Sequence, residues 1–396
     1  MDVHDDGDGA RLAAARIGGR RAFQAAARRA RSNRISCDAR RAFVAPARAG
    51  DPRARRGAGT RRGADDAAPR LVSGWPAAIA AGWHPVALAA RLGTRPIARR
   101  LMDVPLVVFA ADGGPVVMRD RCPHRAMPLS AGRVQGGAIV CPYHGWAFGA
   151  DGRCRAVPGA RTVPDIAAAT LPVRVAGGLV WTTLGDGPFP RLPAVMEDDT
   201  LDRFWWAPRA STARVLDALE NHLDPAHPHH VHPWLVRAPH RRRPARVEVT
   251  VDATGAHARY VEDARATGLL PRLLEGHRGT SIGRLHPPTI GEVAFTGRHG
   301  PTLSIAVVFV PESATVTRPY AHFATPRGAI PAAVKRWLLT AVHWPILQQD
   351  RRVLARQAMR EGDYARGPLD FLGPAIWGFA NGMPPPPQRY TADMLL

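Results

Sequence analysis

Short apolar runs separated by turn residues recur between about residues 75 and 187, a pattern that predicts β-strands. The stretch PLVVFAADGGPVVMRD places two apolar runs on either side of Asp112-Gly113-Gly114, a hairpin signal because glycine tolerates the backbone of a tight turn. Similar runs follow in GGAIVCPYHGWAF and GGLVWTTLGD. We therefore expect an all-β unit over residues 75–187.

The second half of the chain mixes helical and β patterns. Residues 215–235 are helical in character but contain prolines, which interrupt helices. β patterns follow in RVEVTVDATGAHARYVED, TLSIAVVFVPE and TVTRPYAHFATPR, with ATGLLPRLLEGHRGTSIGRLHPPT between them read as pocket loops. A long amphipathic helix is expected over about 331–361, before a polyproline tail in MPPPPQRY. The sequence thus predicts an α+β fold, in which a small β domain precedes a larger domain over residues 188–396.

Residues 1–70 consist largely of alanine, arginine and glycine, with hardly any large apolar side chains. Such a segment cannot bury enough surface to offset the entropy lost on ordering, so we expect it to be disordered. Its acidic beginning, MDVHDDGDG, suits neither a secretory signal nor a transit peptide. The segment is either a dispensable tail or the product of a start codon assigned too far upstream.

The formal net charge of +21 invites a nucleic-acid-binding hypothesis, but the arrangement of the charge does not favour it. Lys335 is the single lysine, and the arginines are spread along the chain without a basic stripe interleaved with aromatic residues. We read this bias as a property of the genome and expect no nucleic-acid partner.

The cysteine count and the hydropathy bear on the location of the protein. Four cysteines in 396 residues cannot form a disulfide scaffold, which favours a reducing compartment, the cytoplasm. No uninterrupted apolar run reaches the roughly 18 residues of a membrane span. No G-x-G-x-x-G stretch opens a βαβ unit, so a flavin or nicotinamide cofactor would have to belong to another protein.

Two cysteines and two histidines form the most specific pattern in the chain, C-x-H-x16-C-x2-H at Cys122, His124, Cys141 and His144. Two thiolates and two imidazoles can hold a tetrahedral zinc ion. They can also hold an asymmetric [2Fe–2S] cluster, with the cysteines on one iron and the histidines on the other. The residue types alone leave both readings open.

The surroundings of these ligands resemble the Rieske cluster-binding motif, in which proline follows each cysteine, as in CPH and CPYHGW, and Gly145 allows close backbone approach. High-potential Rieske proteins carry a disulfide that braces the two loops. Met127 and Tyr143 stand at those positions here, which implies the lower-potential type of the ring-hydroxylating oxygenases. Cys154 is interpreted as a small buried residue, and Cys37, in the N-terminal segment, is given no role.

A second candidate metal site lies in LDALENHLDPAHPHHVHPWLVR, where His227 and His232 follow Asp224 in the spacing D-x2-H-x4-H. Two histidines and a carboxylate form the facial triad of non-haem Fe(II) oxygenases, which leaves positions open for O2 and substrate. The alternative is a histidine-rich surface segment, and the histidines that crowd this region are His222, His229, His230 and His240. These four are expected to be surface groups or neighbours of the ligands.

The carboxylate ligand is expected from the late helix, and Asp350 is our choice. Its proposed helical face is otherwise Ile346, Val353, Leu354 and Gln357. A charged residue inside an apolar stripe is costly to bury unless it is paired or bound to metal. The alternatives are an ion pair of Asp350 with a nearby arginine, or ligation by Glu361 or Asp363 at the helix end.

Taken together, residues 80–360 resemble the terminal oxygenase (α) subunits of Rieske non-haem iron oxygenases, nearest the monooxygenase and demethylase branch of vanillate demethylase and pheophorbide a oxygenase. The resemblance implies a helix-grip (START-like) catalytic domain with an antiparallel sheet and a long C-terminal helix. It implies a [2Fe–2S] cluster, a mononuclear Fe(II), and electrons relayed from NAD(P)H by a flavin reductase, a ferredoxin or both. It also implies a homotrimer without small subunits.

In the family, an aspartate bridges a cluster histidine of one subunit to an iron histidine of the next, which carries over to Asp224 between His144 and His227. Glu220 and Asn221 precede it, and for this pair an active-site role competes with simple helix packing. The expected reaction is hydroxylation or oxidative demethylation of an aromatic or polycyclic molecule.

Three other functions remain as alternatives at this point. The first is oxidative cyclisation or desaturation at the same two sites. The second is an electron carrier that has only the Rieske centre. The remote third is a zinc-binding nucleic-acid protein.

Overall fold

The computed structural model describes residues 74–265, 268–269, 277–298, 300–359 and 365–396. The disorder expected for residues 1–70, like Cys37, lies outside the described residues. So do the alternative ligands Glu361 and Asp363.

The first part of the described chain is built from three small antiparallel sheets, as expected. Their strands are, in sheet order, β1 (Trp83–Leu88), β10 (Leu179–Thr183) and β9 (Val173–Ala176); β2 (Ile97–Leu101), β3 (Val104–Ala111) and β4 (Gly114–Arg119); and β5 (Arg133–Gln135), β6 (Ala138–Val140), β7 (Ala147–Phe148) and β8 (Cys154–Ala156). The short helices are α1 (Ala77–Ala81), η2 (Ala89–Arg91) and η3 (Leu129–Ala131). The predicted hairpin is confirmed, because Ala111 pairs with Gly114 across a two-residue turn.

Strand β3 explains why this part of the chain is rich in short apolar runs. Successive side chains of a strand point to opposite faces. Leu106 and Val108 therefore enter the main core, whereas Val107 and Phe109 enter a second, smaller core that also contains Cys122 and Cys141. Both faces of β3 are covered, and one of them forms the floor under the cysteine loops.

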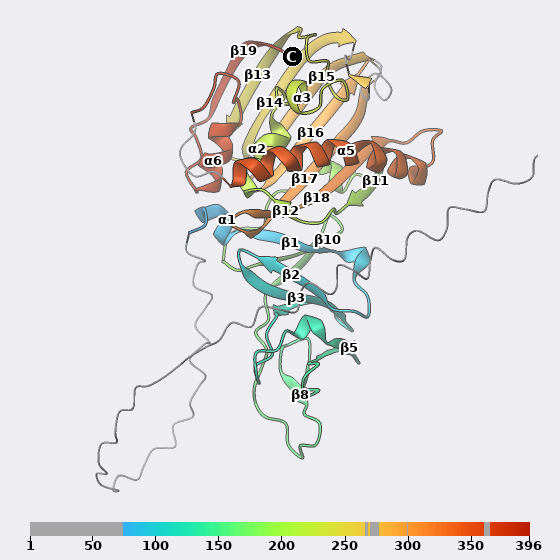
Figure 1. The fold of residues 1–396 in the computed structure, drawn as a ribbon, viewed down its shortest axis with the longest axis vertical. Helices are drawn as coiled ribbons and strands as arrows, with labels where there is room; N and C mark the ends of the chain where they lie inside the picture. The colour runs from blue at the N-terminus through green and yellow to red at the C-terminus, as the bar shows by residue number, and fades with distance from the viewer. Residues whose placement is uncertain (1–73, 266–267, 270–276, 299, 360–364) are drawn as a thin grey trace, which may run out of the picture. The chain divides into compact units, whose positions relative to one another are not determined.

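The second part contains a nine-stranded antiparallel sheet. Its order is β11 (Leu201–Trp206), β18 (Val316–Pro326), β17 (Gly300–Ser313), β16 (Ile290–Gly297), β15 (His277–His286), β14 (Gly255–Arg265), β13 (Pro244–Asp252) and β19 (Gln388–Leu395), with β12 (Ser211–Thr212) paired to β18. The helices are η4 (Ala194–Met196), α2 (Val215–Leu223), α3 (Pro228–Val231), α5 (Ala332–Ala358) and α6 (Gly373–Ala380). Figure 1 shows α5 running across the strands, with α2 on the same face. This α+β arrangement agrees with the predicted helix and sheet pattern.

Two strands and one side chain differ from the sequence expectation. The stretch read as pocket loops contains β15, whose glycines and prolines mask its β pattern. The chain does not end in a polyproline tail, because β19 follows the prolines and pairs with β13 from Gln388 to Leu395. On α5, Val353 is 41% exposed, so it does not share the inner face with Leu354 and Asp350.

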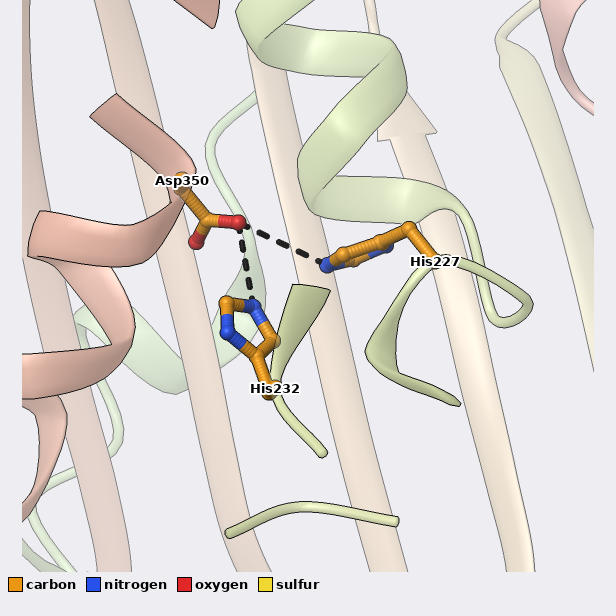
Figure 2. A group of neighbouring side chains, drawn as sticks. All are labelled: His227, His232 and Asp350. Atoms are coloured by element: carbon orange, nitrogen blue, oxygen red, sulfur yellow. Dashed lines mark ion pairs between the residues drawn. The ribbon is translucent and has the colours of Figure 1, made fainter. Parts of the chain in front are cut away.

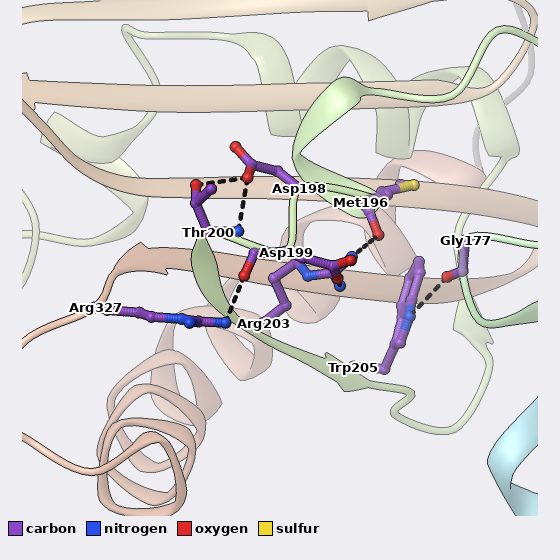
Figure 3. A network of polar contacts seen from close by, with 8 residues as sticks. All are labelled: Gly177, Met196, Asp198, Asp199, Thr200, Arg203, Trp205 and Arg327. Carbon is purple, nitrogen blue, oxygen red and sulfur yellow. Dashed lines mark hydrogen bonds and ion pairs between the residues drawn. The ribbon is translucent and has the colours of Figure 1, made fainter.

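Polar contacts fix the start of the large sheet to the preceding β part (Figure 3). The Trp205 indole N–H donates to the Gly177 carbonyl at 3.0 Å, which ties β11 to the turn between β9 and β10. Arg203 donates to the Met196 carbonyl and forms an ion pair with Asp199. The Trp205 contact joins the large sheet to the preceding β part, and the Arg203 contacts anchor the end of the connection that leads into β11. Among the helices that the structure describes, none is long and apolar enough to cross a membrane.

Candidate metal centres and substrate cavity

Two loops of nearly the same backbone design carry the Cys/His pattern. The Cys122 carbonyl accepts from the Ala126 N–H, and the Cys122 N–H donates to the Met127 carbonyl, both at 2.8 Å. In the second loop the Cys141 carbonyl accepts from the Gly145 N–H at 3.1 Å, and the Cys141 N–H donates to the Trp146 carbonyl at 2.8 Å. Each loop is thus a closed turn that starts at a buried cysteine.

The position four residues after each cysteine has a left-handed backbone, with φ of 57° at Ala126 and 71° at Gly145. A Cβ atom on Gly145 would lie 2.8 Å from Cγ of Pro158, which belongs to a third segment. The backbone conformation at Gly145 favours glycine, and the close approach of Pro158 leaves no room there for a Cβ atom.

The donor atoms of the two loops differ in exposure. Cys122 and Cys141 are each 2% exposed, whereas His124 and His144 are exposed, with ring centroids 4.8 Å apart. The ring of His124 stacks on Trp146 at 4.5 Å and an interplanar angle of 7°. The four donors therefore form one group with a sulfur side turned inward and a nitrogen side turned outward.

Electrostatics within this group separates the thiols from the imidazoles. Burial raises the pKa of the Cys122 thiol; the backbone amide of His124 opposes the rise, and the neighbouring Cys141 adds to it. Partial desolvation and the nearby His144 and Arg125 lower the pKa of His124, which favours the neutral imidazole that a metal needs. Two adjacent buried thiols and two exposed imidazoles suit the unequal irons of a [2Fe–2S] cluster.

The second group is formed by His227, His232 and Asp350, whose ligand atoms all lie within 4.8 Å of one another (Figure 2). Oδ1 of Asp350 lies 3.0 Å from Nε2 of His232 and 3.7 Å from Nε2 of His227. The two imidazole rings are nearly perpendicular, at 80°. Two segments far apart in sequence, the ends of α3 and helix α5, thus bring two ring nitrogens and one carboxylate together.

The local fold positions the two histidines by their other ring nitrogen. His227 Nδ1 donates to the Asp224 carbonyl at 2.9 Å, and His232 Nδ1 donates to Oε1 of Gln349 at 2.8 Å. Both histidines flank the four-residue helix α3, which starts at Pro228 because proline fits the first turn of a helix. With Nδ1 carrying the hydrogen, each Nε2 presents a lone pair.

The buried atoms of this group fit a metal ion. Nε2 of His232 and Oδ1 of Asp350 are both buried without a hydrogen bond of good geometry. Burial lowers the pKa of His232, but the Asp350 carboxylate and the Gln349 amide outweigh it and raise the pKa above its usual value. A negative environment that holds a proton on His232 is also one that favours a cation, and a divalent iron would satisfy both orphaned atoms.

An apolar cavity of about 280 Å³ adjoins this group and is lined by all three of its residues. Large side chains from the sheet and its edge line most of it: Trp206, Phe295, Leu303, Ile305, Phe309 and Phe323. Helix α5 contributes a lining that runs from Val342 to Leu354. A cavity of this size and composition fits a ring-containing small molecule.

Glu220, Asn221 and Asp224, which lie on or at the end of α2, differ in their contacts. Asn221 lines the cavity, but Glu220 does not and forms an ion pair with Arg366 at 2.8 Å. Both oxygens of the Asp224 carboxylate accept backbone N–H groups, from Ala226 at 2.7 Å and from His227 at 3.2 Å. Asp224 also lines the cavity.

The other histidines of this region divide into buried and exposed groups. His222 lines the cavity, and burial lowers its pKa to about 4. His229 is buried and its Nδ1 donates to the Ala238 carbonyl at 3.1 Å, whereas His230 and His240 are exposed. Gln349, which orients His232, was not singled out from the sequence; its position beside Asp350 was the available signal.

Two family models match this chain. The Rieske [2Fe-2S] domain matches residues 82–167, which include both cysteine loops. The vanillate O-demethylase oxygenase C-terminal domain matches residues 212–372, which include His227, His232 and Asp350. The Rieske match replaces the zinc reading of the Cys/His loops, and the oxygenase match supplies the mononuclear iron, so the cofactors are a [2Fe–2S] cluster and a mononuclear iron.

Two curated relatives are similar to parts of this chain. The oxygenase component of chloroacetanilide N-alkylformylase from Rhizorhabdus wittichii is 40% identical over 119 residues, 30% of this chain and 32% of that protein. Methylxanthine N1-demethylase NdmA of Pseudomonas putida is 30% identical over 202 residues, 46% of this chain and 54% of that protein. The matched stretches thus span a third to about half the length of these relatives.

Solved structures show that the fold extends over most of the described chain. Dicamba monooxygenase bound to 3,6-dichlorosalicylic acid superposes with a TM-score of 0.67 at 19% identity, covering 77% of this chain and 97% of that one. The agreement includes a β-rich Rieske part followed by an antiparallel sheet with a long helix. The chain therefore combines a Rieske [2Fe-2S] domain with an oxygenase domain of the vanillate O-demethylase type, the pair of domains found in Rieske non-haem iron oxygenases.

Proposed function

We propose that this chain is the terminal oxygenase of a multicomponent system that hydroxylates or oxidatively demethylates an aromatic or polycyclic small molecule. One observation carries the proposal: His227, His232 and Asp350 converge on the wall of an apolar cavity in a chain that also has a Rieske domain. The relatives named above include a demethylase and an N-alkylformylase, which supports a reaction on a carbon attached to a heteroatom.

The overall reaction fixes what the partners must supply. One oxygen atom of O2 enters a C–H bond of the substrate and the other leaves as water, which requires a pair of electrons and a pair of protons. Hydroxylation of a methyl group on nitrogen or oxygen gives a product that releases formaldehyde. The electrons come from NAD(P)H through a separate flavin reductase, a ferredoxin or both, because this chain has no flavin or nicotinamide motif.

In this proposal the Rieske domain spans residues 75–187 and the catalytic domain residues 188–396. The last strand of the first part ends at Thr183 and the large sheet begins at Leu201, which supports this boundary. Cys122 and Cys141 would bind one iron of the cluster, and His124 and His144 the other.

His227, His232 and Asp350 are proposed to bind the mononuclear iron, which when bound supplies the site at which O2 is activated beside the substrate. The Asp224 carbonyl and Gln349 hold the two imidazoles in the orientation that ligation needs. Asn221 contacts the substrate, whereas Glu220 supports helix α2 through Arg366. The apolar lining excludes water from the reacting carbon.

We further propose a homotrimer in the cytoplasm, in which Asp224 links the two centres between subunits. Its side chain is 38% exposed, and each oxygen that accepts a backbone N–H keeps a further lone pair. His144 is exposed and can donate a ring N–H to such a carboxylate. Asp224 would then join His144 of the partner subunit to His227, a short path for electrons.

Nitric oxide tests the proposed function without knowledge of the substrate, because it occupies the open position of a facial-triad iron in place of O2. Anaerobic, iron-loaded protein treated with nitric oxide should give the electron paramagnetic resonance signal of a high-spin iron–nitrosyl complex. The Asp350→Ala variant should lose this signal and keep that of the reduced cluster. A wild-type protein that contains mononuclear iron but gives no nitrosyl signal would overturn the proposal, because its iron would have no open position.

A further inference from the structure

His343 is a titratable residue of the cavity wall that the proposed reaction does not use. It lies on α5, two helical turns before Asp350, and lines the same cavity. Seven residues at about 1.5 Å each place it roughly 10 Å along the helix axis from Asp350. The cavity lining of α5 starts at Val342, so His343 marks the end of that lining remote from the carboxylate.

The hydrogen-bond partner of His343 defines which ring nitrogen carries the hydrogen. Nδ1 lies 2.8 Å from the Leu339 carbonyl, which can only accept, so Nδ1 carries the hydrogen. Burial lowers the pKa of His343, which keeps the imidazole neutral. Nε2 is then a lone-pair acceptor, and no residue in the described part of the chain donates to it. The edge-to-face contact with Phe323, at 4.9 Å between ring centroids, holds the ring in place.

Other polar residues also line the cavity. The Thr317 hydroxyl donates to the Ala213 carbonyl at 2.8 Å and is buried. Asn221 and His222 lie on α2, shortly before Asp224, and so belong to the side of the iron ligands. The sheet contributes mainly Leu, Ile, Val and Phe side chains. A substrate in this cavity therefore meets largely apolar walls and, about 10 Å along α5 from Asp350, a neutral acceptor in His343.

We propose that His343 is a substrate-recognition residue whose Nε2 accepts a hydrogen bond from a hydroxyl or N–H group of an otherwise apolar, ring-based substrate. The proposal rests on the proposed oxygenase function and narrows its substrate class. The separation from Asp350 corresponds to a donor at one end of a two-ring skeleton and the reacting carbon at the other. A substrate without the donor leaves this acceptor unpaired against an apolar wall, which weakens binding roughly fivefold to hundredfold.

Biphenyl and three of its para-substituted derivatives test the recognition directly, because the four compounds share one skeleton and differ at one end. Dissociation constants for the hydroxy, amino, methoxy and unsubstituted compounds are measured by calorimetry with anaerobic enzyme that contains both metal centres. The hydroxy and amino compounds, which donate, should bind roughly fivefold or more tightly than the methoxy and unsubstituted ones. A methoxy compound that binds as tightly as the hydroxy compound would overturn the proposal, as would binding of none of the four.

Variants of His343 test whether its side chain causes the preference for compounds that donate a hydrogen bond. His343→Leu should abolish the difference between the hydroxy and methoxy compounds. His343→Gln should retain it, because the amide can donate to the Leu339 carbonyl and accept from the substrate. Leu347→Met, on the same cavity face, is the matched control and should leave the preference unchanged. A preference that survives in His343→Leu sinks the assignment.

The metal content separates this proposal from the one on which it rests. Iron and sulfide are measured on the same preparations before the titrations. Protein that lacks the mononuclear iron speaks against the oxygenase function, whereas iron-loaded protein that does not distinguish donors speaks only against the role of His343.

Discussion

The two metal centres of this chain are built in opposite ways. The proposed Rieske ligands come from two short loops that close on themselves, and their imidazoles stand at the surface. The proposed mononuclear ligands come from segments more than 100 residues apart, and His232 is 1% exposed. A centre that exchanges electrons with a partner needs an accessible edge, whereas a centre that activates O2 needs to be enclosed.

The contrast extends to how each centre tolerates change. The Rieske loops depend on backbone conformations at Ala126 and Gly145, so they are sensitive to local strain. The mononuclear centre depends on the packing of α5 against the segment around α3, so it is sensitive to the side chains that orient its ligands. Mutations therefore separate the two centres, and the expected effects differ in size.

The largest effect is expected at the buried centre, from His232→Ala. Loss of one of three ligands should remove the mononuclear iron and abolish the nitrosyl signal, while the visible absorption of the cluster stays unchanged. His230→Ala is the matched control, because His230 is exposed and adjacent in sequence. A His232→Ala protein that retains its full iron content would show that His232 is not needed to hold a mononuclear iron.

We expect acid to lower the free energy of unfolding by about 2 kcal/mol through His84. This change tests whether the Rieske part and the large-sheet part of the chain unfold together. Burial lowers the pKa of His84, on β1, to about 4, with the Ile79 carbonyl partly opposing it. The unfolded chain takes up the proton near pH 6.5 and the folded chain near 4, so the free energy of unfolding falls as the pH falls through this window. From pH 7 to pH 5 the loss from this group is about 2 kcal/mol.

His84→Gln should flatten that pH dependence, since glutamine does not titrate. Guanidinium unfolding at the two pH values is followed by cluster absorbance for the Rieske part and by tryptophan fluorescence for the whole chain. Cooperative unfolding predicts the same flattening in both signals. An unchanged pH dependence in the variant would mean that His84 is not held neutral by burial.

Loss of Gln349, which orients His232, should weaken iron binding less than loss of a ligand does. Gln349→Leu removes the acceptor of His232 Nδ1, and loss of such a partner typically weakens metal binding about 10- to 100-fold. Gln348→Leu is the matched control, because Nε2 of Gln348 is buried without a hydrogen-bond partner in the described chain. Titration of the two variants with iron compares their affinities for the mononuclear iron. Equal affinities would show that Gln349 does not orient His232 for iron binding.

The smallest effect is expected in the Rieske loops, where one pair of substitutions compares equivalent positions. Gly145→Ala should destabilise the cluster-loaded protein by about 1–2 kcal/mol, because of its positive φ and the contact with Pro158. Ala126→Gly should be nearly neutral, since relief of the left-handed strain offsets the added chain entropy. Thermal unfolding of both variants measures which substitution destabilises the protein more. A larger loss of stability in Ala126→Gly than in Gly145→Ala would contradict this prediction.

The sequence predicted the local features of this protein better than the distant ones. Both cysteine loops and the hairpin at residues 105–120 are contiguous in sequence, so spacing and turn chemistry identify them. His227, His232 and Asp350 were placed together by residue type and by family resemblance, because no periodicity reports which helix packs beside which loop. Gln349 had only its position beside Asp350 as a signal, because a hydrogen bond to a distant residue leaves no pattern in the sequence. His343 had none, because the sequence does not show which side chains of α5 line a cavity.

The misread strands have a common physical cause. β15 and β19 are flanked by glycine and proline, which mark turns in local reasoning, and both strands exist because a neighbouring strand offers its backbone groups. Val353 was assigned to the inner face of α5 from residue type alone, but it lies on the exposed side. Tertiary pairing outweighs local propensity at each of these positions.

The central claim is that one chain holds two separable metal centres, and metal and sulfide analysis of anaerobically purified protein tests it most directly. Wild-type protein should contain about three irons and two sulfides per chain. Asp350→Ala should lose about one iron with its sulfide and red-brown colour intact, and Cys122→Ser should lose the sulfide and keep the mononuclear iron. Zinc without sulfide, or an iron content that Asp350→Ala leaves unchanged, would contradict the account.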